Sequence, residues 1–307
     1  MKAIKHLTYY LSIMAFVNLA AGAVTPAEFT QVEEKATQGD PIAQNELGLN
    51  YYNGDGTQKE LKKAVFWFTK GAKQGSAGAQ NSLAICYALG DGVNKDQKQA
   101  VAYYSRAAKQ GNAEAQINLG ICYDFGDGVQ KNPKKAASWY AKAAKQGDAD
   151  AQCFLGFCYD QGSGVQKDQQ QAVSLYASAA VQGHAKAQCN LGLCYLNGQG
   201  IKKDQKEAVS WFTKAAEQGY SRAQYDLGLC YIEGEGVQKA PKKAVFWYTK
   251  AAKQGYVDAQ NNLGICYVEG NGVLKDLKKA TEWIKKAKDA GHLKAAETWK
   301  TLELWKY

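Results

Sequence analysis

A 36-residue period runs through almost the whole chain and leaves little freedom in how the chain folds. The dipeptide Ala-Gln recurs at this interval without an insertion, and so do a tyrosine, a Gly-x-Gly pair and a closing glycine. The Ala-Gln pairs begin at Ala43, Ala79, Ala115, Ala151, Ala187, Ala223 and Ala259. A fixed period of this length is typical of stacked units that bury their apolar faces against one another. We therefore predict a repeat array rather than compact domains.

Each repeat has the pattern of two helices joined by a turn. In residues 40–75, Ala43, Leu47 and Tyr51 share one face at helical spacing, and a Gly-x-Gly pair follows as a stop signal. A second apolar stripe occupies residues 61–74 and ends at another glycine. We call these two segments helix A and helix B. The pattern predicts an all-α solenoid of helix-turn-helix repeats.

Two aromatic ladders have the spacing of core residues, so we expect both to be buried. The ladders are Tyr51, Tyr87, Tyr123, Tyr159, Tyr195, Tyr231 and Tyr267 in helix A, and Trp67, Trp139, Trp211, Trp247 and Trp283 in helix B. Helix A also has a recurrent interior glycine, first at Gly48. Because glycine inside a helix costs about 1 kcal/mol relative to alanine, its recurrence predicts close contact with helix B.

The two ends of the chain depart from the period. Residues 24–39 match helix B alone, residues 40–291 hold seven complete repeats, and residues 292–307 keep helix A spacing as a terminal capping helix. Seven pairs and two single helices give 16 predicted helices.

Residues 1–23 read as a signal peptide, with cleavage expected after Ala23. Lys2 and Lys5 form a positive start, an apolar stretch follows, and small residues precede the cleavage point. We expect a secreted or periplasmic protein, with an uncleaved N-terminal membrane anchor as the alternative. No second apolar run exists, so no membrane span is expected in the mature chain.

The charge pattern argues against nucleic acid as a partner. Without Lys2 and Lys5 the chain carries a formal net charge of +7. The lysines recur in helical register beside alanines and acids, without the clustered arginines of a nucleic-acid groove.

The repeat resembles the Sel1-like repeat, which is related to tetratricopeptide repeats. One copy matches at Ala115, Leu119, Gly120, Tyr123, Gly126, Gly128, Val129, Lys135, Ala136, Trp139, Tyr140, Lys142, Ala143, Ala144, Gln146 and Gly147. The resemblance covers essentially all of residues 25–307. It implies a right-handed superhelix whose members act as scaffolds or adaptors.

The cysteines are predicted to be reduced core residues. Cysteine-rich members of the resembled family bridge helix A to helix B, but helix B has no cysteine here. Equivalent positions in adjacent repeats lie about 8–10 Å apart, beyond the reach of a disulfide. Each repeat offers mostly one thiol and no histidine beside it, so no metal site is expected. The positions are Cys86, Cys122, Cys158, Cys194, Cys230 and Cys266, with Cys153 and Cys189 in addition.

No catalytic constellation is visible, and neither an enzyme nor a cofactor is predicted. His184 and His292 fall where other repeats carry the N-cap of helix A, so we interpret them as capping residues. The motifs S-x-x-K and K-T-G, which β-lactam-binding enzymes carry, are absent.

A binding surface is expected on helix A, at positions that vary between repeats. If the solenoid is like the tetratricopeptide one, helix A lines a concave groove with an acidic rim, and lysines of helix B face outward. The candidate binding residues are Asn45, Asn81, Asp124, Phe125, Asp160, Tyr225, Glu233, Asn261 and Glu269.

These observations favour a non-catalytic, exported scaffold that binds a peptide or protein in the groove. The alternative is a module that binds carbohydrate or another polymer of the cell envelope, or a hydrolase acting on such material. The sequence does not indicate an oligomeric state.

Overall fold

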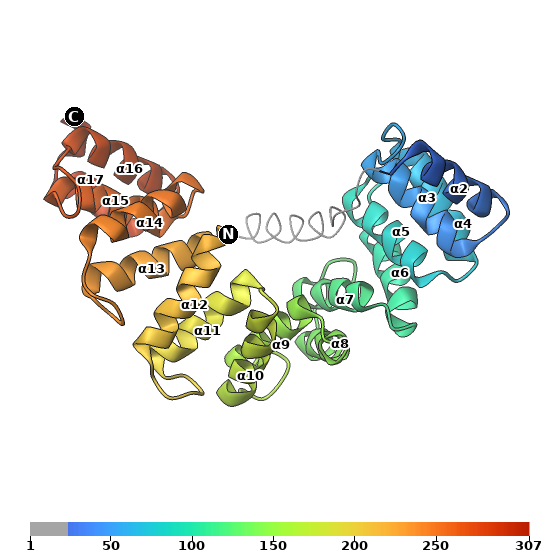
Figure 1. Cartoon of the computed structure of the whole chain (residues 1–307), viewed down its shortest axis with the longest axis horizontal. Coiled ribbons are helices and arrows are strands. Elements are labelled where there is room, and N and C mark those ends of the chain that lie inside the picture. The colour runs from blue at the N-terminus through green and yellow to red at the C-terminus, as the bar shows by residue number, and fades with distance from the viewer. Residues whose placement is uncertain (1–23, 307) are drawn as a thin grey trace. The chain divides into compact units, whose positions relative to one another are not determined.

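The computed structural model describes residues 24–306 and shows an all-helical solenoid in which consecutive helices pack in pairs (Figure 1). The described residues form 16 α-helices and no strand, which confirms the predicted number of helices. The predicted signal peptide, residues 1–23, lies outside the described residues. Within the described part of the chain, every helix is too short or too polar to cross a membrane.

The helices follow the predicted order of helix A and helix B. The helix A elements are α3 (Pro41–Asn53), α5 (Ala77–Leu89), α7 (Ala113–Phe125), α9 (Ala149–Gln161), α11 (Ala185–Asn197), α13 (Ser221–Glu233) and α15 (Val257–Glu269). The helix B elements are α4 (Leu61–Lys73), α6 (Gln97–Lys109), α8 (Pro133–Lys145), α10 (Gln169–Val181), α12 (Gln205–Glu217), α14 (Pro241–Lys253) and α16 (Leu277–Asp289). Flanking elements are α2 (Pro26–Thr37), α17 (Leu293–Thr301) and the short 3-10 helix η1 (Leu304–Lys306).

The described chain divides into two compact units. Unit 1 comprises residues 24–151 with 163–165, and unit 2 comprises residues 152–162 with 166–306. The division falls inside α9, although the sequence period continues through it without a break. Each unit has its own stack of helix pairs.

Helix ends are set by local capping chemistry. The Asp40 carboxylate accepts hydrogen bonds from the backbone N–H groups of Ile42 and Ala43 at the start of α3. His184 and His292 act in the same way through Nδ1, each accepting from a backbone N–H at 3.0 Å. The interpretation of both histidines as caps is therefore confirmed.

Within a repeat, the interior glycine of helix A lies against a ring of helix B. A Cβ atom on Gly120 would lie 2.5 Å from Cε1 of Tyr140, so only glycine allows this approach. The predicted close contact is confirmed. The ring belongs to the residue directly after the tryptophan position of helix B. The rings opposite a glycine are Phe68, Tyr140, Tyr176, Phe212 and Tyr248, all fully buried. Tyr104 is also fully buried but lies in the repeat that has Ala84 in place of the glycine, and Gly264 meets Ile284 instead of a ring.

The expectation that the tryptophan ladder is core is wrong for most of its members. Only Trp67 is buried, and Trp139, Trp211, Trp247 and Trp283 are half-buried. The tryptophan and the residue directly after it both lie on the apolar stripe of helix B. The helix points the residue after the tryptophan toward helix A, so that residue is the more deeply buried of the two. The tyrosine ladder of helix A is similarly half-buried apart from Tyr51.

Neighbouring repeats are joined by the glutamine of the Ala-Gln pair. In unit 2, Nε2 of Gln224 donates to the carbonyl oxygen of Ala216 in the preceding helix B at 3.1 Å. Its Oε1 accepts from Nε2 of Gln254, at the end of its own helix B, at 2.8 Å. One buried amide thus joins three helices. The donation recurs at Gln44, Gln80, Gln116, Gln188 and Gln260.

The Gly-x-Gly turn provides the other contact between repeats. The second glycine of the pair lies against the first residue of helix B in the preceding repeat. A Cβ atom on Gly236 would overlap the carbonyl group of Gln205, and Gly128 has the same relation to Gln97. The turn therefore rests directly on backbone, with no room for a side chain.

Short elements cover the two ends of the described chain. At the start, the Phe29 ring of α2 meets Tyr51 edge-on, with centroids 5.7 Å apart. At the other end, η1 places Leu304, which is fully buried, in an apolar cluster with Ile284 and Ala295. These contacts remove from water the apolar faces that a terminal repeat would otherwise expose.

Candidate functional site

The cysteines form no reactive or metal-binding centre in residues 24–306. All eight are buried and none takes part in a disulfide within the described residues, as the sequence predicted. Burial raises the pKa of the Cys86 thiol to about 12, so its nucleophilic thiolate is scarce at neutral pH. The described residues contain no group of three or more potential metal ligands.

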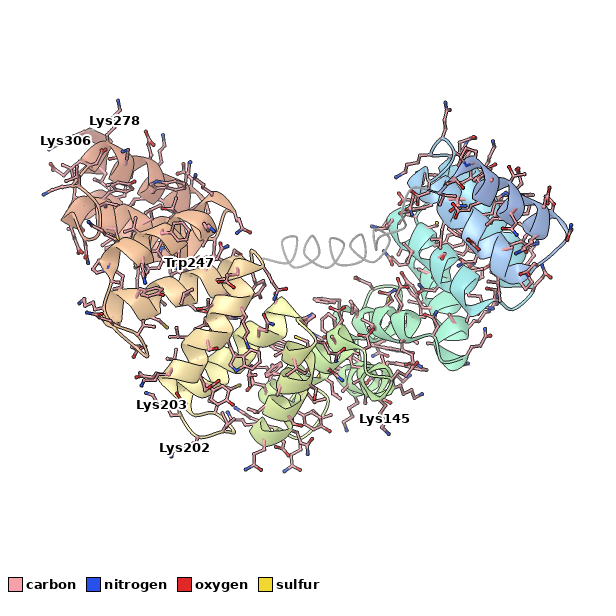
Figure 2. All side chains as sticks on the ribbon, in the orientation of Figure 1. Lys145, Lys202, Lys203, Trp247, Lys278 and Lys306 are labelled. Carbon is pink, nitrogen blue, oxygen red and sulfur yellow. The ribbon has the colours of Figure 1, made fainter. Side chains whose placement is uncertain are left out.

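The outward surface of helix B carries lysines stacked on aromatic rings. The Lys142 ammonium lies 3.8 Å from the ring centroid of Trp139, and Lys214 lies 4.0 Å from that of Trp211. Other lysines, such as Lys145, extend away from the ribbon into solvent (Figure 2). Lys142 and Lys214 each cover part of a half-buried tryptophan, which keeps this surface both charged and solvated.

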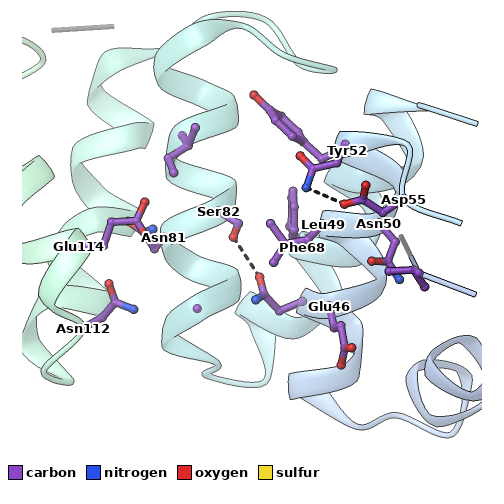
Figure 3. A pocket seen from close by; sticks show the side chains of 15 residues that line it. Glu46, Leu49, Asn50, Tyr52, Asp55, Phe68, Asn81, Ser82, Asn112 and Glu114 are labelled. Carbon is purple, nitrogen blue, oxygen red and sulfur yellow. Dashed lines mark hydrogen bonds between the residues drawn. The ribbon is translucent and has the colours of Figure 1, made fainter. Parts of the chain in front are cut away.

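A cavity of about 330 Å³ opens in unit 1 across three successive helix A elements, α3, α5 and α7. Two of the predicted binding residues, Asn45 and Asn81, line it together. Figure 3 labels Asn81 among the lining side chains. Oδ1 of Asn45 accepts a hydrogen bond from the Ser82 hydroxyl at 3.0 Å. The walls combine amides with the apolar side chains of Leu49 and Phe68. We call this space the unit 1 cavity.

Asn50 is the most unusual residue of the unit 1 cavity. It occupies the position at which the other six repeats carry a buried cysteine. The side chain is only 6% exposed, and its Nδ2 has no hydrogen-bond partner among the described residues. A buried donor without an acceptor costs about 1–3 kcal/mol. The cavity therefore contains a donor whose hydrogen-bonding capacity is unused by the fold.

Glu114, the second residue of α7, supplies a carboxylate to the same cavity. Asn81 donates a hydrogen bond to it and in turn accepts one from Nδ2 of Asn118 at 3.4 Å. Burial raises the pKa of Glu114 above its ordinary value, the nearby Asp148 adds to the increase, and the bond from Asn81 opposes it. A positive charge in the cavity would stabilise the ionised form.

A second cavity, of about 290 Å³, lies in unit 2 among α9, α11 and α13. The predicted residue Asp160 lines it, together with Asn190, Asn197 and Arg222. Nε2 of Gln161 donates to the Asp160 carboxylate at 2.8 Å. We call this space the unit 2 cavity.

The other predicted residues lie outside both cavities. Asp124 is half-buried, and burial raises its pKa. Phe125 is 42% exposed, and Glu233 and Glu269 are exposed at the ends of their helices. Each of these side chains is accessible enough to contact a partner. Their membership of one binding surface stays a prediction.

Tyr225 and Asn261 are integrated into the packing of unit 2. The Tyr225 ring lies near that of Tyr256, with centroids 5.2 Å apart. Asn261 is only 3% exposed, and its Nδ2 donates to Oδ1 of Asn262 at 3.4 Å. Variation between repeats at the positions of Tyr225 and Asn261 therefore reflects differences in packing as well as differences in the exposed surface.

Asp226 in α13 is a buried carboxylate that should make the stability of unit 2 depend on pH. It accepts a hydrogen bond from the Cys189 thiol at 3.5 Å and lies 3.7 Å from Nε of Arg222. Burial, which Arg222 only partly offsets, raises the pKa of Asp226 from 3.8 to about 6. The folded state thus binds more protons than the unfolded state, and stability falls as pH rises from about 4 to 6.

Replacing Asp226 by asparagine should remove this dependence. We expect Asp226→Asn to stabilise unit 2 by about 1–3 kcal/mol above pH 6 and to change little below pH 4. Urea unfolding followed by circular dichroism across this pH range measures the difference. Asp276→Asn is the control, because hydrogen bonds lower rather than raise the pKa of that carboxylate. An equal gain at both pH extremes would contradict the assignment.

Sequence reasoning missed three residues that define the cavities: Asn50, Glu114 and Arg222. Asn50 has a sequence signal, since it is the only break in the cysteine ladder. Glu114 and Arg222 occupy equivalent positions three repeats apart, and that position changes charge along the chain. A position-by-position comparison of the repeats would have identified both.

Stacked helix pairs, with cavities built from successive helix A elements, define a helical repeat protein of the solenoid class. The Sel1 repeat model matches seven consecutive segments: residues 41–76, 77–112, 113–148, 149–184, 185–220, 221–256 and 257–292. The chain belongs to the Sel1 repeat family. Proteins of this family generally mediate protein–protein interactions and are generally non-catalytic.

Two solved structures illustrate the similarity. A Sel1 repeat protein from Oxalobacter formigenes is 34% identical with a TM-score of 0.73, and the match covers 90% of this chain and 80% of that one. A protective antigen of uropathogenic Escherichia coli with an SLR fold is also 34% identical, with a TM-score of 0.67. That match covers 85% of this chain but only 64% of the antigen. No curated protein sequence matches the chain.

Proposed function

We propose that the chain is a non-catalytic scaffold that holds an extended segment of a partner protein against its helix A surfaces. The observation that carries the proposal is the concentration of side-chain amides in the unit 1 cavity, where Asn45, Asn50 and Asn81 stand together. A primary amide both donates and accepts hydrogen bonds, as a peptide bond does. Such a surface suits polypeptide backbone, and the general role of the family supports the same class of partner.

We also propose that the protein acts outside the cytoplasm, as a secreted or periplasmic protein. The support is the composition of residues 1–23, with a positive start, an apolar stretch and small residues before the expected cleavage point.

Charge reversal on helix A should weaken a bound protein partner. A partner crosslinked to the protein in its own cell, then purified, provides the ligand. We expect Asp124→Lys and Asp160→Lys each to lower its affinity by at least about 5-fold, because both carboxylates flank the helix A surface. Surface plasmon resonance at two salt concentrations measures the change.

Lys145→Glu is the matched control, since it reverses an exposed charge on helix B of unit 1. Its affinity should stay within about 2-fold of the original. Unchanged binding by both aspartate variants would contradict the proposed surface. Recovery of a polysaccharide and no polypeptide would favour the envelope-polymer alternative instead.

A further inference from the structure

The two cavities occupy equivalent places in two sets of three repeats, but one equivalent residue reverses its charge. The unit 1 cavity ends at Glu114 and the unit 2 cavity ends at Arg222. Both are the second residue of the third helix A in their set, 108 positions apart. The arrangement of the three helix A elements is thus the same in both sets, but the charge at this position is negative in unit 1 and positive in unit 2.

We propose that the unit 1 cavity is a subsite for a lysine or arginine side chain of a bound polypeptide, with Glu114 as the carboxylate that pairs with it. The inference rests on the proposed function and specifies one side chain of its ligand. Among the described residues that line this cavity, Glu46, Asp55 and Glu114 are acidic and none is basic.

The shape and walls of the cavity suit a long side chain with a charged end. Leu49, Phe68 and Ile85 provide apolar contacts for a methylene stem, and Glu114 lies beside Asn81 among the polar residues (Figure 3). Lysine and arginine side chains combine such a stem with a cationic head. The cation would also favour the ionised form of Glu114, whose pKa burial raises.

Asn50 provides an independent indication that a ligand belongs here. Its Nδ2 donor is buried beside the cavity without an acceptor, at a position where every other repeat uses cysteine. A backbone carbonyl of the bound polypeptide would satisfy this donor. The cavity would thus recognise two features at once: the carbonyl through Asn50 and the cation through Glu114.

Three blocked pentapeptides test the subsite: Ala-Ala-Lys-Ala-Ala and its counterparts with norleucine or glutamate at the centre. Binding is followed by NMR through the side-chain amide signals of Asn50 and Asn81 in the full chain. We expect the lysine peptide to bind at least about 5-fold more tightly than the norleucine peptide, and the glutamate peptide to bind most weakly.

Two variants separate the roles of the two residues. Glu114→Gln should reduce the preference for lysine over norleucine to less than about 2-fold. Asn50→Cys introduces the residue that six repeats already tolerate, so the fold should be retained. This variant should weaken the binding of the lysine and norleucine peptides equally, by about 5-fold, so the ratio of their affinities stays unchanged. Because Asn50 is replaced, the side-chain amide signal of Asn81 reports binding in this variant. Arg222→Gln, in unit 2, is the control and should change neither value.

The outcomes distinguish this inference from the proposed function. Peptide binding that perturbs only unit 2 signals, or a lysine preference that survives Glu114→Gln, would overturn the subsite and leave the scaffold role intact. If no peptide perturbs either unit, the subsite is overturned, and the affinity of the crosslinked partner decides the scaffold role separately.

Discussion

Gly236→Ala should destabilise unit 2 by about 2–5 kcal/mol. Gly236 has φ of +71°, a conformation that costs a residue with a side chain about 1–2 kcal/mol. The added Cβ would also overlap the carbonyl group of Gln205 and lie 3.0 Å from the nitrogen of Lys206, both in the preceding helix B. Because backbone cannot rotate aside as a side chain can, the two repeats would have to separate.

Gly219→Ala separates the effect of crowding from that of backbone conformation. Gly219 also has a positive φ, +90°, but no atom lies within 4 Å of a Cβ placed there. This variant should lose only about 1–2 kcal/mol. Urea unfolding monitored by circular dichroism compares the two. Equal losses would show that the turn does not hold the repeats together.

Gln224→Glu should destabilise unit 2 by about 3–5 kcal/mol at pH 8. The substitution keeps the shape of the side chain but replaces the Nε2 donor, 3.1 Å from the carbonyl oxygen of Ala216, with a carboxylate oxygen. The residue is only 3% exposed, so the charge is poorly solvated and faces another acceptor. Protonation of the introduced carboxylate restores a hydrogen-bond donor. Keeping it protonated at pH 8, well above its ordinary pKa, costs about 5 kcal/mol, which sets the upper limit of the loss.

The pH dependence of this variant has a definite sign. A glutamate whose pKa is raised in the folded state stabilises the fold at low pH and loses that contribution as pH rises. We therefore expect Gln224→Glu to approach the stability of the original protein near pH 5. Gln254→Glu is the control, because Gln254 is exposed and loses only its bond to Gln224. A loss independent of pH would contradict the role assigned to the amide.

The helices could be predicted almost completely from the sequence, because their signals are local. The period places each helix A and helix B, and caps such as Asp40 and His184 act within three residues of their own position. Stop signals are equally local, since Gly54 takes the left-handed conformation that ends α3. Each of these features depends on neighbours along the chain, which a sequence displays directly.

Burial was harder to predict, because it depends on which of two adjacent apolar positions faces the partner helix. The tryptophan of helix B was expected in the core, but the next residue fills the space beside the glycine of helix A. The sequence showed that the glutamine of the Ala-Gln pair recurs in every repeat. It did not show the two side-chain hydrogen bonds of that glutamine, because their partners lie 8 and 30 positions away. The site was least predictable, and only Asn45 and Asn81 of the candidates line the unit 1 cavity.

The sequence by itself determined the repeat, the order of the helices and their limits, because a 36-residue period with caps and glycines specifies each helix pair locally. Only the tertiary structure decided where the array divides into two units and which variable positions meet in a cavity. Those features arise from packing between repeats, where Asn50 and Glu114 come from helices two repeats apart. The period gives their spacing, and the packed helices bring them to one cavity.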